Sequence, residues 1–173
     1  MQVQDEKTAL LLGSRKILVI EDEHYTRKVI RTLLMTIGIR SIQEATDGRA
    51  GLEAILTAVP DVVLVDWSMQ GLDGPGFVRA VRSPATFPHP DIPIIMLTAH
   101  GERSRVIEGA RLGINEYLLK PVSSQALQAR ILSVVMHPRP MVRRGDYYGP
   151  EPRKLSTYKP ENDQGYSTLV MVN

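Results

Sequence analysis

The stretch that decides the fold is Asp61–Gly74, which reads Asp-Val-Val-Leu-Val-Asp-Trp-Ser-Met-Gln-Gly-Leu-Asp-Gly. Within it, Val62–Val65 is a run of four apolar residues, three of them β-branched, that stops at the carboxylate of Asp66. Such a run predicts a strand buried on both faces of a sheet. Asp73 is suited to cap a following helix with Pro75 in its first turn. The stretch therefore predicts a buried strand, a loop that starts at a carboxylate, and a helix.

Strand and helix patterns alternate along the chain on either side of this stretch. Short apolar runs predict strands, and apolar residues at helical spacing predict the helices between them. The predicted strands are 16–20, 41–45, 61–66, 92–97 and 115–119, and the predicted helices are 24–37, 49–58, 75–82, 103–112 and a last one capped by Ser123. Strict alternation of strand and helix implies an α/β fold with a parallel sheet and helices on both faces.

Length and composition limit the function classes. A chain of 173 residues that is 43% hydrophobic can bury one core of ordinary size. It has no cysteine, which excludes disulfides and thiolate metal sites and fits a reducing compartment. Its N-terminal apolar run, Ala9–Leu12, is too short for a signal peptide or a membrane span. We therefore expect a cytoplasmic protein without a membrane partner, and a net charge of +2 is too small to predict a nucleic-acid partner.

Polar side chains stand at the ends of four predicted strands: Glu21 and Asp22, Asp66, Thr98 and Lys120. Right-handed crossovers bring these ends to one edge of the sheet, where open α/β sheets bind their ligands. Three carboxylates that lie close together repel one another, and Mg²⁺ with its oxygen ligands is the natural way to relieve that repulsion. Asp66 can then act as a nucleophile toward phosphorus, while Lys120 and the Thr98 hydroxyl stabilise the transferring oxygens.

With these motifs the chain resembles a response-regulator receiver domain of bacterial two-component signalling, of the stand-alone, chemotaxis-regulator-like kind. The resemblance covers about residues 15–136 through Ile-Leu-Val-Ile-Glu-Asp-Glu, Leu-Val-Asp-Trp-Ser-Met-Gln-Gly-Leu-Asp-Gly, Ile-Ile-Met-Leu-Thr-Ala and Glu-Tyr-Leu-Leu-Lys-Pro-Val. It implies a flavodoxin-like receiver fold, a five-stranded parallel sheet in the order 2-1-3-4-5. It also implies a phosphorylation switch, with no enzyme activity beyond its own phosphoryl transfer and hydrolysis.

The resemblance assigns the phosphoryl acceptor and the metal ligands. Asp66 matches the phosphoacceptor, and Glu21 and Asp22 match the acid pair that binds Mg²⁺ together with it. The backbone carbonyl of Ser68, two residues past the acceptor, is expected to complete the protein ligands. Many relatives have proline where Gln70 stands, so the loop after Asp66 is expected to be less rigid here.

The resemblance also implies a switch and its partners. Thr98 matches the switch hydroxyl, Tyr117 the switch aromatic and Lys120 the family's lysine, whose peptide bond to Pro121 is expected to be cis. The phosphodonor would be a histidine kinase or a histidine phosphotransfer protein. A downstream target would bind the face built from residues 103–136, and a homodimer stays open.

Other functions remain to be weighed against the switch. A phosphatase of the haloacid dehalogenase type needs a second aspartate two residues after the nucleophile, where this chain has Ser68. A flavin binder on the same fold needs a phosphate loop after the first strand, where Glu21, Asp22 and Glu23 would repel a phosphate. A protein-interaction module that works without phosphorylation would be expected to lack a site residue, and none is missing.

The sequence divides into an N-terminal arm (1–15), the receiver domain (16–136) and a tail (137–173). The arm carries no helix prediction, although its leucines can pack locally. The tail holds five of the twelve prolines and four of the six tyrosines of the chain, among several arginines. It is interpreted either as a disordered extension or as a segment that docks on a partner or on the domain's own surface. Its basic and aromatic composition keeps nucleic acid open as an alternative partner.

Overall fold

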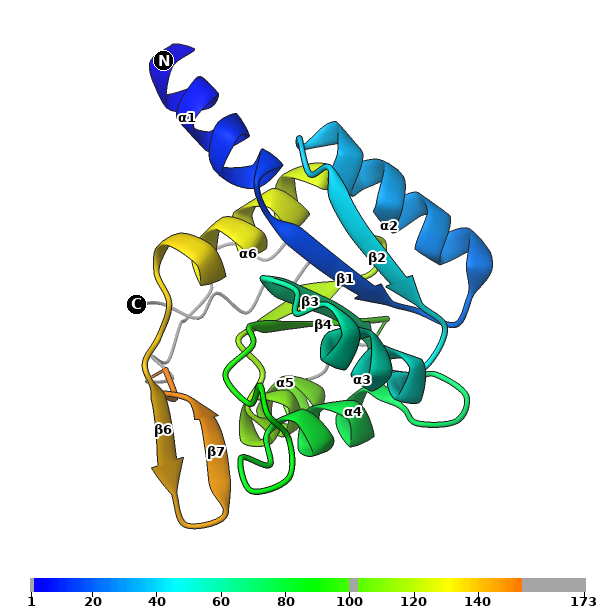
Figure 1. Cartoon of the computed structure of the whole chain (residues 1–173), viewed down its shortest axis with the longest axis vertical. Coiled ribbons are helices and arrows are strands. Elements are labelled where there is room, and N and C mark those ends of the chain that lie inside the picture. The colour runs from blue at the N-terminus through cyan, green and yellow to red at the C-terminus, as the bar shows by residue number, and fades with distance from the viewer. Residues whose placement is uncertain (1, 100–102, 154–173) are drawn as a thin grey trace.

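The computed structural model describes residues 2–99 and 103–153. Its centre is a parallel sheet of five strands in the order β2-β1-β3-β4-β5, which confirms the expected order (Figure 1). The strands are β1 (Lys16–Ile20), β2 (Ser41–Ala45), β3 (Val62–Asp66), β4 (Ile94–Thr98) and β5 (Glu116–Leu119). β3 lies in the middle of the sheet and is buried along its whole length, as its unbroken apolar run predicts.

The helices α2 (His24–Thr36), α3 (Gly48–Thr57), α4 (Gly74–Val81), α5 (Arg103–Leu112) and α6 (Ser124–Met136) cover the two faces of this sheet (Figure 1). A further helix, α1 (Gln2–Gly13), precedes the first strand. Ile17 and Val19 of β1 face the core beneath α2 and α6, whereas Leu18 and Ile20 face the core beneath α3 and α4. In the described part of the chain, no helix is both long and apolar enough to cross a membrane.

Two helix starts follow directly from the residues that cap them. The Asp73 side chain accepts a hydrogen bond from the Gly76 N–H at 2.8 Å, and Pro75 occupies the first turn of α4. The Ser123 hydroxyl accepts a bond from the Ala126 N–H at 3.1 Å and starts α6. Both caps were predicted, because a short polar side chain ahead of an apolar period satisfies the free N–H groups of the first turn.

The N-terminal arm differs from the sequence interpretation, because residues 2–13 form the helix α1. This helix projects from the body of the molecule beyond the start of β1 (Figure 1). Leu12 is fully buried in the core beneath α2 and α6, whereas Leu10 on the same helix is 78% exposed. One buried leucine near its C-terminus therefore attaches α1 to the domain.

The segment after α6 forms an antiparallel hairpin of β6 (Met141–Arg144) and β7 (Tyr147–Pro150). Gly145, with a φ of 59°, occupies the turn between the two strands, a conformation that glycine adopts without strain. β7 lies against α5, and the Tyr148 hydroxyl donates a hydrogen bond to Asp91 in the loop before β4. The hairpin thus contacts the domain, while residues 154–173 lie outside the described residues.

Candidate functional site at the carboxyl edge of the sheet

The sheet brings three carboxylates together at its carboxyl edge. Ile20 of β1 pairs in register with Val65 of β3, so Glu21 and Asp66, the residues that follow them, lie side by side. Glu21, Asp22 and Asp66 each offer a carboxylate oxygen, and these oxygens all lie within 4.8 Å of one another. Glu21 and Asp66 are buried and Asp22 is exposed. Crowded carboxylate oxygens of this kind are the donor set that fits a hard divalent cation such as Mg²⁺.

Lys120 balances two of these negative charges. Its Nζ lies 2.6 Å from Glu21 Oε2 and 2.8 Å from Asp66 Oδ1. The lysine is placed by its backbone N–H, which donates to the carbonyl of Thr98 at 2.8 Å, and its peptide bond to Pro121 is cis as expected. Burial lowers the pKa of Lys120, but the hydrogen bonds and charges of Asp66 and Glu21 outweigh burial and raise the pKa above its ordinary value. Lys120 therefore stays charged at neutral pH.

The same environment disfavours the charged form of Glu21, although it favours the charged form of Lys120. Burial raises the pKa of the Glu21 carboxyl, and the charge of Asp66 raises it further. The hydrogen bond from Lys120 and the bond from the Glu23 N–H to Glu21 Oε1 act against this increase. A buried acid that depends on one lysine for its counter-charge is a strong cation-attracting group once that lysine turns toward another anion.

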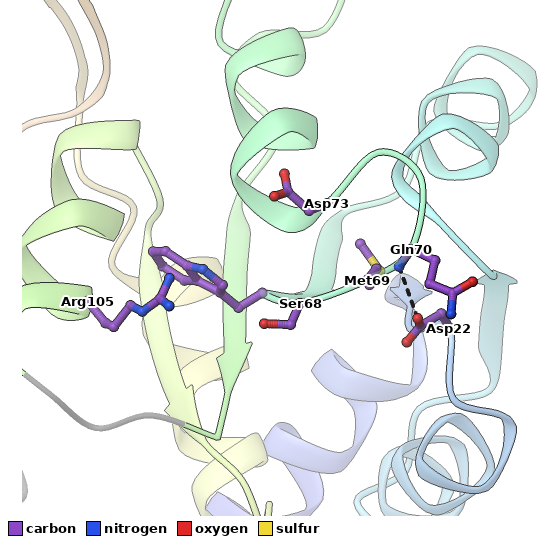
Figure 2. Close-up of a pocket in the computed structure, with 7 residues that line it drawn as sticks. Asp22, Ser68, Met69, Gln70, Asp73 and Arg105 are labelled. Atoms are coloured by element: carbon purple, nitrogen blue, oxygen red, sulfur yellow. Dashed lines mark hydrogen bonds between the residues drawn. The ribbon is translucent and has the colours of Figure 1, made fainter.

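The loop after β3 is tied to the acidic cluster through Gln70. The Gln70 N–H donates a hydrogen bond to Asp22 Oδ2 at 3.1 Å (Figure 2). A proline at this position has no N–H, so it could not make this bond. The loop closes where the Gly74 N–H donates to the Trp67 carbonyl at 3.1 Å, and a Cβ on Gly74 would lie only 2.3 Å from the carbonyl oxygen of Asp66. Gln70, which stands where many relatives have proline, therefore adds a hydrogen bond that positions Asp22.

An open pocket of about 470 Å³ lies beside the acids. Its lining consists of Asp22, Trp67, Ser68, Met69, Gln70, Asp73 and Arg105 (Figure 2). Ser68 is exposed on the rim of this pocket. The guanidinium carbon of Arg105 lies 4.9 Å from the centre of the Trp67 ring, a cation–π arrangement. Arg105 could not be predicted from the sequence, because one more basic residue early in a helix looks like an ordinary solvated charge.

Trp67 is only 5% exposed, so it is a core residue whose edge reaches the pocket. Its ring meets the ring of Tyr117 edge to face, with centroids 6.5 Å apart and planes at 68°. This contact connects the loop that carries the pocket to β5.

Thr98 and Tyr117 lie on the paired strands β4 and β5 and share a hydrogen bond. Thr98 is buried at the end of β4, next to the strand that carries Asp66. Tyr117 is half-buried on β5. Burial raises the pKa of the Tyr117 hydroxyl, while a hydrogen bond with Thr98 and the charge of Arg105 oppose that increase. The fold thus gathers the candidate residues at one edge, with Ser68 on the pocket rim.

Comparison with known proteins identifies the family. The family model for the response regulator receiver domain matches residues 17–132. The chemotaxis protein CheY of Pseudomonas aeruginosa is 35% identical over 116 residues, which cover 67% of this chain and 92% of that protein. The phosphate regulon transcriptional regulatory protein PhoB of Klebsiella pneumoniae is 34% identical over 128 residues, 74% of this chain and 55% of that protein.

Solved structures agree with the sequence matches. The chemotaxis protein CheY4 of Vibrio cholerae superposes with a TM-score of 0.63 at 29% identity, over 70% of this chain and 98% of that one. A putative response regulator from Chloroflexus aurantiacus J-10-fl gives a TM-score of 0.64 at 30% identity, over 71% and 98%. None of these matches favours a phosphatase, a flavin binder or a phosphorylation-independent module. The chain belongs to the response regulator receiver domain family and is a phosphorylation-dependent switch of two-component signalling.

Proposed function

We propose that Asp66 accepts a phosphoryl group from the phosphohistidine of a histidine kinase or a histidine phosphotransfer protein. The observation that carries this proposal is the position of the Asp66 carboxylate, at the end of β3, within the acidic cluster and 2.8 Å from Lys120. Phosphoryl transfer needs positioning and positive charge around the phosphoryl oxygens more than it needs covalent chemistry. The end of β3 positions the Asp66 carboxylate, Lys120 supplies positive charge, and the neighbouring acids can hold a cation that supplies more.

The transfer is an in-line displacement at phosphorus. A carboxylate oxygen of Asp66 forms a bond to phosphorus while the bond from phosphorus to the histidine ring nitrogen breaks, and the electron pair leaves on that nitrogen. Lys120 turns its ammonium group to the phosphoryl oxygens, and the Thr98 hydroxyl donates to another of them. Later, water attacks phosphorus, inorganic phosphate leaves and the carboxylate returns. We propose no enzyme activity beyond these two steps.

Glu21, Asp22, Asp66 and the backbone carbonyl of Ser68 would hold a magnesium ion. A bound magnesium ion supplies additional positive charge to the phosphoryl oxygens. Glu21 is already paired with Lys120, so its carboxylate is oriented toward a cation. Asp22 is fixed by the Gln70 N–H and is exposed, which makes it the ligand that an incoming ion meets first.

The output of the switch is proposed to be the face formed by α5, β5 and α6, residues 103–136. Tyr117 connects this face to the site through its hydrogen bond with Thr98. A downstream target protein would bind this face in one state of the switch and not in the other. A cytoplasmic location is proposed with it.

The first prediction tests the acceptor. Incubation with acetyl phosphate and Mg²⁺, followed by intact mass, should add one phosphoryl group to the wild type and none to Asp66→Asn. Asp61→Asn is the matched control, because Asp61 comes just before the same strand and should not change labelling. Equal labelling of the wild type and Asp66→Asn would remove Asp66 from this role.

A further inference from the structure

The segment after α6 lies outside the family match, which ends at residue 132, and it contacts the start of β5. Arg139 Nη2 donates a hydrogen bond to the backbone carbonyl of Asn115 at 2.7 Å, and the same guanidinium also bonds the carbonyl of Glu151. Arg153 pairs with Glu116. β5 is the edge strand of the sheet, so the segment is held beside an element that has a strand neighbour on one side only.

The ion pair with Glu116 brings the segment into contact with a buried charge of the domain. Its carboxylate is buried, with 2% exposure, although it lies on the edge strand. Arg153 and the hydroxyl of Ser133, which donates at 2.9 Å, both contact Glu116 Oε1, and Arg130 lies 3.5 Å from Oε2. A buried carboxylate needs such partners, and one of the two cations comes from the docked segment.

The Tyr-Tyr-Gly-Pro run of the hairpin fits the end of α5 closely. The Tyr147 hydroxyl donates to the Pro150 carbonyl at 2.6 Å, so the Tyr147 ring lies along its own strand next to Gly149. A Cβ on Gly149 would lie 2.7 Å from the Cα of Gly113, the residue that ends α5 with a φ of 91°. Only glycine permits this approach of two backbones.

Arg82 joins the docking surface to the rest of the domain. Its guanidinium donates to the carbonyls of Gly113 at 2.8 Å and Ile92 at 2.9 Å, and to the Asn115 side chain at 2.9 Å. Burial lowers the pKa of Arg82 to about 10, so the group remains charged at neutral pH. The residues that receive the hairpin are therefore held by one buried cation from the end of α4.

We propose that residues 137–153 are an intramolecular ligand of the α5–β5–α6 face, and that docking of this segment opposes the phosphorylated state. The residues that hold it, Gly113, Asn115 and Glu116, lie in sequence between α5 and Tyr117. We therefore expect a phosphorylation response that moves α5 and Tyr117 to change the contacts that bind the segment. This inference rests on the proposed function of Asp66. By thermodynamic linkage, release of the segment must strengthen binding of a phosphoryl group by the same factor that phosphorylation weakens docking.

The second prediction concerns hydrogen exchange of the full chain with Mg²⁺, with and without beryllofluoride as a phosphoryl mimic. In the wild type the mimic should increase exchange over residues 141–150, and in Asp66→Asn it should not. Arg139→Ala and Arg153→Ala should increase this exchange without the mimic and tighten beryllofluoride binding about fivefold or more. Arg143→Ala is the control, because the exposed side chain of this arginine, in the same hairpin, makes no hydrogen bond or ion pair within residues 2–99 and 103–153. If loss of the Glu116 contact unfolds Arg153→Ala, Arg139→Ala carries the test alone.

The outcomes separate this inference from the proposed function. A response over residues 103–136 with unchanged exchange at 141–150 would overturn the coupling and leave Asp66 as the acceptor. A wild type that shows no response to beryllofluoride anywhere would contradict the acceptor role itself. Mimic affinities of Arg139→Ala equal to those of Arg143→Ala would also overturn the coupling. Protection of 141–150 that grows with protein concentration would show that a second copy holds the segment, which overturns an intramolecular ligand.

Discussion

At the scale of single residues, the charge balance of the site depends on Lys120. The lysine contacts two acids, and one of them, Glu21, is 1% exposed. Breaking a buried ion pair by removing one partner leaves an uncompensated charge, and this loss is larger than the net contribution of the intact pair. The Lys120 side chain is 21% exposed, so water screens part of the effect but cannot replace the contact with Glu21.

The third prediction follows from this balance. Without Mg²⁺, Lys120→Met should lower the free energy of unfolding by roughly 3 kcal/mol, the lower end of the range for a broken buried pair. In a Glu21→Gln background the same change should have a smaller effect, since Asp66 is then the one acid of the two left without its counter-charge. Urea unfolding of the four proteins measures both values. Mg²⁺ should restore part of the loss in Lys120→Met by supplying the missing positive charge.

Lys16→Met serves as the control for that cycle, because Lys16 is an exposed lysine at the start of β1 and should change stability by less than about 0.5 kcal/mol. An equal loss for Lys120→Met in both backgrounds would show that Lys120 stabilises the fold by packing and not by charge.

Sequence reasoning found the residues of this site that stand at strand ends. The order of strands in a parallel α/β sheet decides which chain segments meet, so Glu21, Asp66 and Lys120 could be brought together from spacing alone. It did not find Arg105 or the bond from Gln70 to Asp22. Both depend on the conformation of a loop or the orientation of a helix end, which a residue pattern does not predict.

At the scale of secondary structure, α1 is held to the domain mainly through one side chain. Leu12 is fully buried and Leu10, two residues earlier, is 78% exposed. An isolated helix of 12 residues is marginal in water, so packing and not propensity must stabilise it. This explains why residues 1–15 gave no helix prediction: their apolar residues do not form a helical stripe, and only the tertiary contact of Leu12 decides the outcome.

The fourth prediction compares these two leucines. Leu12→Ala should lower the free energy of unfolding by about 2 to 5 kcal/mol, because it removes buried methyl groups and leaves a cavity beneath α2 and α6. Leu10→Ala removes the same atoms from an exposed site on the same helix and should stay within about 0.5 kcal/mol of the wild type. Urea midpoints at constant m-value measure the difference. Similar decreases in the free energy of unfolding for both variants would mean that the face of α1 with Leu10 also packs against another part of the protein.

The hairpin is the element whose contacts the sequence could least anticipate. Its tyrosines, glycine and proline are visible in the sequence, but their partners Asp91 and Gly113 are ordinary loop residues. A two-stranded hairpin is marginal alone, so its order depends on the surface that receives it. That surface exists only after α5 and β5 have folded.

At the scale of the whole molecule, the fold was predictable because five strand-helix units leave few alternatives. A buried parallel sheet requires near-continuous apolar strands, and right-handed crossovers fix which edge carries the polar residues. We propose that the structural change of the switch begins at Thr98 and Tyr117. The Thr98 hydroxyl has one hydrogen to donate, and when it donates to a phosphoryl group it can only accept a bond from Tyr117. We expect Tyr117 to adjust to this change, and with it the contact of its ring with Trp67.

The fifth prediction tests whether this exchange of bonds carries the response. Moving a population from 1:99 to 99:1 takes about 5.5 kcal/mol, which a few charge-assisted hydrogen bonds of ~1.5 to 3 kcal/mol each can supply. Thr98→Ala should therefore still accept phosphate at Asp66 but lose most of the change over residues 103–136, measured by amide chemical shifts with beryllofluoride. Thr32→Ala removes an exposed hydroxyl of α2 and should respond as the wild type does. A full response in Thr98→Ala would mean that the charge of the phosphoryl group reaches α5 and β5 by a route that bypasses the bond between Thr98 and Tyr117.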